Sequence, residues 1–213
     1  AIDVNENETP SFVIAYNNLG HALLSEQRFE DAVTVFQRAV EINPNYSKAQ
    51  NNLGNALSEL KRYDKAIGYY QQAIKIEPDY AEAFNNFANA LRNRGQLKES
   101  VEYYREAIRL DGEYDEAHFN LGITWSQQGQ LEKAIAQYQK ALEINSKFTK
   151  AHNNLAGLLA QKGDISGAIL HYRQAIAIDP GFAKAHNNLG SALAGQGKFK
   201  ESILSFEKAL RDR

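Results

Sequence analysis

The sequence lacks cysteine and methionine, contains only four prolines, and has no block of like charge. Without cysteine, the chain cannot form disulfides, use a thiolate nucleophile or bind metal through sulfur. It also lacks the run of about 18 apolar residues that a membrane-spanning helix needs, so we expect no membrane insertion. The formal net charge of -2, with both signs interspersed, argues against nucleic acid as a partner.

The first residues, AIDVNENETPSF, are polar and acidic, whereas a secretion signal has basic residues followed by an apolar segment. The location of the protein stays unknown from the sequence, with the cytoplasm favoured. Because no initiator methionine is present, we expect the sequence to start inside a longer parent protein or after processing. Residues 1–12 are assigned to an N-terminal extension or to the end of a preceding repeat.

From Val13 onward the sequence repeats with a period of 34 residues. The segments QNNLGNALS, HNNLAGLLA and HNNLGSALA occupy the same position in different rows, and alanine closes the pattern of every row. Each row holds two runs of apolar residues at three- and four-residue steps, which predict two amphipathic helices. The predicted single domain, 13–213, therefore contains the repeats 13–46, 47–80, 81–114, 115–148, 149–182 and 183–213.

Turn and small residues support these helical hairpins. In four rows a glycine can end the first helix, at Gly95, Gly129, Gly163 and Gly197. In three rows a proline ends the second, at Pro44, Pro78 and Pro180. One further column holds small residues, where bulk would separate the two helices of a hairpin: Gly20, Gly54, Ala88, Gly122, Ala156 and Gly190.

This pattern resembles the tetratricopeptide repeat (TPR) family. Row two matches its bulky residue, Leu-Gly pair, alanines, aromatic and final proline with Gln50, Leu53, Gly54, Leu57, Ala66, Tyr70, Ala73 and Pro78. The resemblance covers residues 13–213. It implies an all-α, right-handed superhelical solenoid of six TPR helix-turn-helix repeats, whose first helices line a concave groove that binds peptides or partner proteins.

The first helices look most like the repeats of protein O-linked N-acetylglucosamine transferases, which share the NNL-type signature. In that subgroup the asparagine before the leucine belongs to a ladder that binds a peptide backbone. The resemblance implies the same role here for Asn18, Asn52, Asn86, Asn120, Asn154 and Asn188.

The preceding column is expected on the same groove-facing surface: Asn17, Asn51, Asn85, Phe119, Asn153 and Asn187. An asparagine amide offers two donors and an acceptor, so it can bind both polar groups of a peptide unit. The alternative is that these asparagines hydrogen-bond within the stack or face solvent. Asparagine is a mediocre helix former, which favours a binding role.

Other groove positions would set selectivity. Asn55 and Asn89 lie further along the first helices, and Lys150 and Lys184 predict a mildly basic second half that could hold an acidic peptide end. Ordinary solvated lysines are the alternative. Phe119 and Ile123 break the polar pattern in row four, either as an apolar anchor pocket or through local repacking.

The sequence predicts a protein-protein interaction scaffold rather than an enzyme, since it contains no phosphate-binding loop or nucleophile motif. We expect no cofactor. Metal binding is also not expected, because His118, His152 and His186 stand on successive repeats about 8–10 Å apart. Two alternatives are the substrate-recruiting arm of a larger enzyme, such as a glycosyltransferase, and a module that self-associates end to end through its uncapped C-terminal helix.

Overall fold

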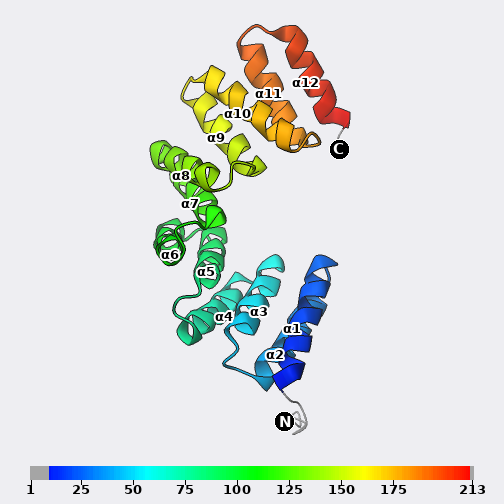
Figure 1. Ribbon diagram of the computed structural model, residues 1–213, viewed down its shortest axis with the longest axis vertical. Coiled ribbons are helices and arrows are strands. Elements are labelled where there is room, and N and C mark those ends of the chain that lie inside the picture. Colours follow the sequence, from blue (N-terminus) through cyan, green and yellow to red (C-terminus); the bar gives the residue numbers. More distant parts are fainter. Residues whose placement is uncertain (1–9, 212–213) are drawn as a thin grey trace. The chain divides into compact units, whose positions relative to one another are not determined.

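The computed structural model describes residues 10–211, and every regular element in that range is an α-helix. Figure 1 shows these helices as consecutive pairs joined by short turns. In chain order they are α1 (Pro10–Ser25), α2 (Phe29–Ile42), α3 (Ser47–Glu59), α4 (Tyr63–Ile76), α5 (Ala81–Asn93), α6 (Leu97–Leu110), α7 (Asp115–Gln127), α8 (Leu131–Ile144), α9 (Thr149–Gln161), α10 (Ile165–Ile178), α11 (Ala183–Gly195) and α12 (Phe199–Arg211). Helix α1 begins three residues before the predicted first repeat, and residues 1–9 of the predicted extension lie outside the described range.

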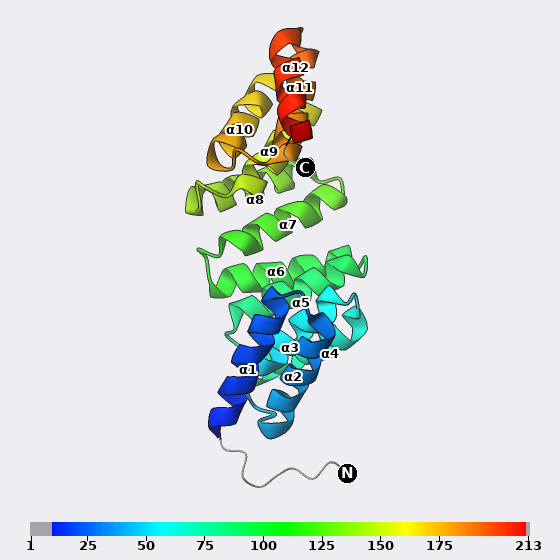
Figure 2. The ribbon, with the colours of Figure 1, turned by 90° about the vertical axis from the view of Figure 1, so that its right-hand side faces the viewer.

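The chain divides between Gly112 and Glu113 into two compact units. Unit 1 holds the hairpins α1–α2, α3–α4 and α5–α6, and unit 2 holds α7–α8, α9–α10 and α11–α12. Within unit 1, α3 contacts both α1 and α5, and within unit 2, α9 contacts α11. Figure 2 shows the same hairpins from the side. We call the side formed by α1, α3 and α5, or by α7, α9 and α11, the first-helix face of each unit.

Close approach within a hairpin depends on the column of small residues. A Cβ atom added to Gly54 would lie 2.5 Å from the ring of Tyr70, and one added to Gly122 would lie 2.7 Å from the ring of Tyr138. Both distances are far below a normal carbon-carbon contact. The predicted reason for these glycines, close packing of the two helices, is therefore confirmed.

Within each unit, a second helix packs against the first helix of the following hairpin. In unit 1, Leu53 and Leu57 of α3 share one apolar cluster with Val33 and Phe36 of α2 and with Ile67 of α4. Leu53 is fully buried, and burial of such a side chain contributes about 1.5–3 kcal/mol. A single hairpin could not cover this stripe, so stability comes from stacking.

The turns inside the hairpins use a left-handed residue. The glycines at this position have φ between 74° and 87°, as in Gly129 with φ 74°. Gln27 and Lys61 replace glycine in the first two hairpins, with φ 59° and 57°. The predicted glycine termination of the first helices is confirmed, and these two side-chain-bearing residues adopt the same conformation under strain.

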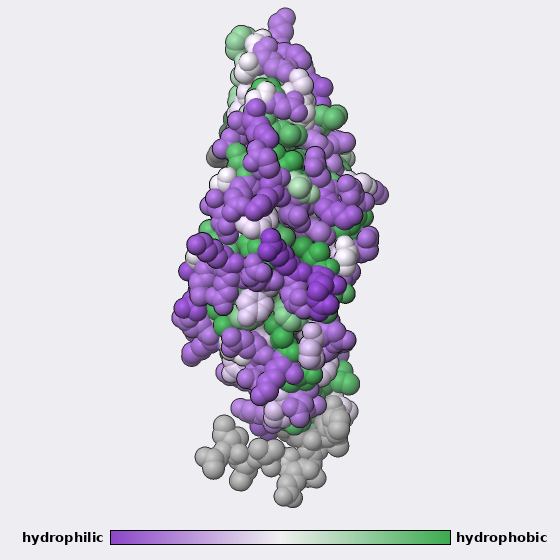
Figure 3. Space-filling model, turned by 90° about the vertical axis from the view of Figure 1, so that its left-hand side faces the viewer, coloured by the Kyte–Doolittle hydropathy of each residue, from purple (hydrophilic) through white to green (hydrophobic). Residues whose placement is uncertain are grey.

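Both outer helices expose apolar positions that are buried in other hairpins. Ile203 of α12 is 58% exposed, whereas Ile67 at the same repeat position is 9% exposed. Leu19 of α1 is 49% exposed, whereas Leu53 is fully buried. Elsewhere charge is interspersed, and the face seen in Figure 3 is mainly hydrophilic with smaller apolar areas between. No helix within residues 10–211 is long and apolar enough to cross a membrane.

Candidate peptide-binding site

Two adjacent positions in the middle of each first helix carry the predicted site. Adjacent helix residues point about 100° apart, so the two positions face different surroundings. We call the first position the stack column, with Asn17, Asn51, Asn85, Phe119, Asn153 and Asn187. We call the second the ladder column, with Asn18, Asn52, Asn86, Asn120, Asn154 and Asn188.

The stack column lies mostly inside the protein. Four of its asparagines are at most 7% exposed: Asn17, Asn51, Asn85 and Asn153. Asn187, in the last hairpin, is exposed. The Asn51 Nδ2 donates to Glu82 Oε1 at 3.1 Å and to the Tyr80 hydroxyl at 3.4 Å. These amides hold hairpins together, so we base the proposed peptide contact on the ladder column.

In unit 1 the ladder asparagines are tied to the preceding hairpin. Asn52 Nδ2 donates to Asn17 Oδ1 at 2.8 Å and lies 2.9 Å from His21 Nε2. Asn86 Nδ2 donates to Asn51 Oδ1 at 3.1 Å. Hydrogen bonding within the stack, the alternative raised by the sequence, thus describes these pairs. Asn18 of the first hairpin is exposed.

Unit 2 breaks this chain of amides at one point. Asn188 Nδ2 donates to Asn153 Oδ1 at 3.0 Å, as in unit 1. The residue that would accept from Asn154, however, is Phe119. Asn154 Oδ1 accepts from Asn153 Nδ2 at 3.3 Å, while within residues 10–211 the Asn154 Nδ2 has no hydrogen-bond partner. Both of its N–H donors are therefore available to a ligand.

Phe119 itself has a packing role. It is 9% exposed, and its ring centroid lies 4.7 Å from that of Phe148 and 5.7 Å from that of Tyr138. Phe148 stands where unit 1 has Tyr80, whose hydroxyl bonds to Asn51. An apolar pair thus replaces a polar pair at the same place. This contact is consistent with local repacking, one of the two interpretations raised by the sequence, and the contact of Phe119 with a peptide stays a prediction.

A third column, one turn further along the first helices, also differs between the units. In unit 1 the Tyr70 hydroxyl donates to Asn55 Oδ1 at 2.8 Å, and the Tyr104 hydroxyl donates to Asn89 Oδ1 at 2.6 Å. Burial raises the pKa of Tyr70 well above its ordinary value, so this hydroxyl remains a hydrogen-bond donor even at alkaline pH. Unit 2 has Ile123, Gly157 and Ser191 in this column instead. Both of the predicted groove residues Asn55 and Asn89 are thus engaged by tyrosines of their own hairpins.

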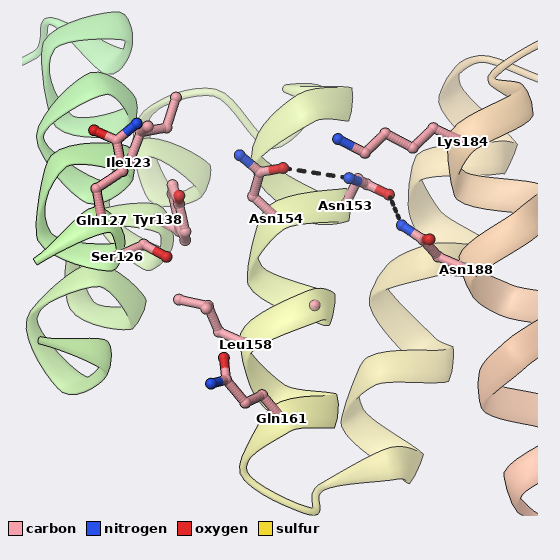
Figure 4. Close-up of a pocket in the computed structure, with 11 residues that line it drawn as sticks. Ile123, Ser126, Gln127, Tyr138, Asn153, Asn154, Leu158, Gln161, Lys184 and Asn188 are labelled. Carbon is pink, nitrogen blue, oxygen red and sulfur yellow. Dashed lines mark hydrogen bonds between the residues drawn. The ribbon is translucent and has the colours of Figure 1, made fainter. Parts of the chain in front are cut away.

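Unit 2 contains a pocket of about 380 Å³ on its first-helix face. Helix α7 supplies one wall, α9 the centre and α11 the opposite edge, as Figure 4 shows. The lining residues are Ile123, Ser126, Gln127, Tyr138, Asn153, Asn154, Gly157, Leu158, Gln161, Lys184 and Asn188. The structure therefore brings together Asn154, Asn188, Asn153 and Lys184 among the predicted site residues. Lys150 is exposed and does not line this pocket.

Lys184 is the single charged residue that lines the pocket. Figure 4 shows its side chain extending from α11 toward Asn153 and Asn154 on α9. Among residues 10–211 no carboxylate forms an ion pair with it. At the same repeat position on α5, unit 1 has Glu82, which accepts from Asn51; α3 has Lys48 there. The pocket of unit 2 thus presents amide donors and one positive charge.

Several lining residues were not predicted from the sequence. Leu158 occupies a column that is otherwise alanine or threonine, for example Ala56 and Ala90, and Gly157 replaces the asparagines of unit 1. These departures from the repeat were the available signal. Trp125, which stands in a hairpin-core position, is 7% exposed and has Lys133 Nζ 4.5 Å from its ring centroid, so it belongs to the packing.

The periodic histidines bind neighbouring side chains and backbone. His118 Nδ1 lies 2.8 Å from Gln137 Oε1, and His152 Nδ1 lies 3.0 Å from His171 Nδ1. Burial first, and the neighbouring His152 second, lower the pKa of His171 below its ordinary value. His186 Nε2 lies 2.9 Å from the Pro180 carbonyl. In the described part of the chain no cluster of three or more metal-ligating side chains is present.

Stacked two-helix hairpins with a 34-residue period define a helical-repeat protein, and the family models specify which one. Models described as Tetratricopeptide repeat match residues 11–79, 45–113 and 183–212, and one described as TPR repeat matches 126–163 and 157–197. The matches cover most of the sequence, so the chain belongs to the tetratricopeptide repeat family. The predicted all-α class of TPR helix-turn-helix repeats is confirmed. Nothing found links the chain to the O-linked N-acetylglucosamine transferase repeats in particular.

Solved TPR structures share the fold. MamA is 26% identical with a TM-score of 0.68 over 75% of this chain and 94% of its own. PilF of Pseudomonas aeruginosa is 19% identical with a TM-score of 0.82, covering 95% and 98%. YrrB, described as a TPR protein with an unusual peptide-binding site, is 24% identical with a TM-score of 0.64, covering 84% and 92%. The comparison with curated protein sequences gives no match.

Proposed function

We propose that this chain is a protein-interaction scaffold that binds an extended peptide segment of a partner on the first-helix face of unit 2. Membership of the TPR family supports a role in protein-protein interaction. The observation that carries the location is Asn154, whose two N–H donors have no partner within residues 10–211 and which lines a pocket. A peptide carbonyl is the natural acceptor for such a group.

Two ladder asparagines would hold the peptide backbone. Asn154 offers both N–H donors, and Asn188 offers the one that it does not use toward Asn153. They stand on α9 and α11, and neighbouring helices lie about 8–10 Å apart. An extended chain rises about 3.3 Å per residue, so the two amides would bind carbonyls roughly three residues apart.

The test uses peptides selected for binding to the whole chain from a random displayed library. We expect Asn154→Ala and Asn188→Ala each to weaken binding of a selected peptide about threefold to tenfold, measured by fluorescence anisotropy. Gln139→Ala is the matched control, because it removes an exposed amide from the second helix α8. Equal affinity for all three variants would place the binding surface elsewhere.

We also propose that the exposed face of α12 covers α1 of a second copy. The observation in favour is the exposure of two apolar side chains that are buried elsewhere in the repeats. Ile203 is exposed whereas its counterpart Ile67 is buried, and Leu19 is exposed whereas its counterpart Leu53 is buried. At this second-helix position, Val33 and Ile67 share an apolar cluster with residues of the following first helices in unit 1, and Ile169 does so in unit 2. A head-to-tail contact of this kind extends into a chain of molecules rather than a closed dimer.

Sedimentation velocity over a range of concentrations tests this association. We expect the mass to rise with concentration, and Ile203→Lys to keep the chain monomeric. Leu170→Lys is the control, since Leu170 is equally exposed, at 57%, but lies on α10. A wild-type chain that stays monomeric throughout would contradict the association and leave the peptide contact of unit 2 unaffected.

A further inference from the structure

Building on the peptide contact proposed for unit 2, we infer that its pocket selects an apolar side chain together with an acidic residue two or three positions away. The apolar side chain would lie between α7 and α9. The acidic residue would lie on the α11 side, against Lys184. This preference for an apolar and an acidic residue follows from the side chains that line the pocket and from the space left at Gly157.

The apolar part of the pocket comes from substitutions that unit 1 does not share. Ile123 supplies an aliphatic wall where unit 1 has Asn55, and Leu158 supplies a second wall where unit 1 has Ala56. Figure 4 shows Ile123 and Leu158 on the two sides of the space, with the Tyr138 ring between their helices. Such a lining favours an apolar side chain over a polar one, because it removes apolar area from water.

The pocket is open because nothing fills the space above Gly157. A Cβ atom added there would find only the Tyr172 hydroxyl, at 3.8 Å. Gly54 and Gly122, by contrast, are required by tight packing against tyrosine rings. Gly157 therefore leaves room rather than relieving a clash. The resulting volume of about 380 Å³ falls within the range of about 300–1,000 Å³ that is usual for ligand sites.

The positive charge of Lys184 at the edge of the pocket is the reason to expect an acidic residue in the peptide. Lys184 is the single charged lining residue, and the remaining polar lining groups are neutral amides and hydroxyls. Neither Lys184 nor Lys150, at the same repeat position on α9, has an ion-pair partner among residues 10–211. A carboxylate on the peptide would therefore meet an uncompensated positive charge.

The distance between the two features sets their separation in the peptide. The apolar walls stand on α7 and α9, whereas Lys184 stands on the next first helix, α11. One helix spacing of about 8–10 Å corresponds to about three residues of an extended chain, and the Lys184 side chain extends from α11 toward α9 (Figure 4), so the two peptide residues lie two or three positions apart. Alternate side chains of an extended peptide point to opposite sides, so a separation of two keeps both on the protein side.

The experiment repeats the random-peptide selection against three proteins: the wild-type chain, Ile123→Asn and Lys184→Glu. Ile123→Asn introduces the residue that unit 1 carries at Asn55 and Asn89, so the fold accommodates it. We expect wild-type peptides to be enriched in Leu, Ile or Phe with Asp or Glu two or three positions away. Ile123→Asn should lose the apolar preference, and Lys184→Glu should replace the acidic preference with Lys or Arg.

Affinities of one synthetic peptide carrying both features complete the test. We expect Lys184→Glu to weaken binding about tenfold or more and a peptide with lysine in place of its acidic residue to recover the loss. Lys48→Glu, at the same repeat position in unit 1, is the matched control and should leave binding unchanged. Circular dichroism confirms that each variant remains helical.

The outcomes separate the two proposals. Peptides that bind through Asn154 but show neither preference, or that ignore both Ile123→Asn and Lys184→Glu, overturn the selectivity and keep the peptide contact. Apolar enrichment without acidic enrichment overturns the role of Lys184. A selection that yields no binder above background overturns the peptide contact itself and the selectivity with it.

Discussion

Asn51 in unit 1 and Phe119 in unit 2 occupy the same repeat position, yet Asn51 bonds to Tyr80 and Glu82 whereas Phe119 packs on Phe148. In unit 1 the amide of the stack column receives the ladder amide of the next hairpin, and the first-helix face is closed by these bonds. In unit 2 one phenylalanine removes the acceptor and leaves Asn154 with unused donors. A repeat can therefore keep its fold while a single change turns a structural amide into an available one.

The largest effect is expected from Phe119→Asn, which gives unit 2 the residue of unit 1 without its partners. Phe148 has no hydroxyl, and Lys150 stands where Glu82 accepts, so the new amide would be buried without an acceptor for its N–H groups. We expect a loss of about 3 kcal/mol in the free energy of unfolding, measured by urea denaturation. Adding Phe148→Tyr should recover about 1 kcal/mol.

Asn187→Ala serves as the control for this column, because Asn187 is exposed and should change stability little. A Phe119→Asn variant as stable as the wild type would show that asparagine and phenylalanine are interchangeable at this stack-column position.

The ladder column offers a second contrast, between Asn52→Ala in unit 1 and Asn154→Ala in unit 2. Asn52 is 4% exposed and donates to Asn17, with His21 also within hydrogen-bond distance, so its loss should lower stability by about 1–2 kcal/mol. Asn154 has one bond, from Asn153, and its loss should lower stability by less than about 0.5 kcal/mol. Urea denaturation of the two variants side by side measures the difference, and equal losses would contradict the contrast.

A smaller effect is expected at the turns inside the hairpins. Lys61 adopts φ 57° in unit 1, whereas unit 2 has Gly129 at the same repeat position with φ 74°. Lys61→Gly should raise stability by about 0.5–1 kcal/mol, and Gly129→Lys should lower it by about 1 kcal/mol. Thermal denaturation measures both, and a stabilising Gly129→Lys would contradict the strain assigned to Lys61.

The smallest expected effect is on the pH dependence of stability, because a histidine pair in unit 2 replaces an aromatic pair of unit 1. Unit 1 stacks Phe84 on Tyr103, whereas unit 2 places His152 against His171 at the same repeat positions. Because the pKa of His171 is lowered in the folded chain, the unfolded chain binds more protons below about pH 6.5. The contribution of neutral His171 to the free energy of unfolding is thus complete above about pH 6.5. It is lost as the pH falls through the lower pKa that His171 has in the folded chain.

We expect His171→Gln, which reproduces the His118 and Gln137 pair of the preceding hairpin, to flatten the fall in stability between neutral and mildly acidic pH. Urea denaturation over a pH series measures the slope. The reciprocal change Gln137→His should steepen it, and an unchanged slope in His171→Gln would assign the pH response to other groups.

The fold could be predicted in detail because each repeat carries the same few constraints. The 34-residue period determines the length of each hairpin. The small residue opposite an aromatic determines how closely its two helices pack, and the glycine determines where the turn between them lies. Gly54 against Tyr70 and Gly129 at its left-handed turn show this directly. Because the pattern occurs six times, a residue that departs from it in one row, such as Lys61 at a glycine position, does not change the prediction.

The site could be predicted only in part. The ladder column was recognised, and its contact with a peptide stays a prediction, but the burial of Asn51 and Asn153 was not foreseen, because composition does not say which face of a helix a neighbour covers. The pocket also depends on Leu158, which looks like an ordinary core residue in the sequence. Departures from the repeat consensus, rather than agreement with it, mark the pocket that we propose as the peptide-binding site.

Gly157 has a consequence for how this protein can change. A glycine in a helix interior lowers stability by about 0.5–1 kcal/mol relative to alanine, so Gly157 makes α9 less stable than alanine would at this position. Only the Tyr172 hydroxyl lies within 4 Å of a Cβ atom added at Gly157. We therefore expect position 157 to accept alanine and then larger side chains without a clash with the core. A substitution at Gly157 would therefore change the depth of the pocket, and with it the proposed choice of peptide, while the packing of the repeats is preserved.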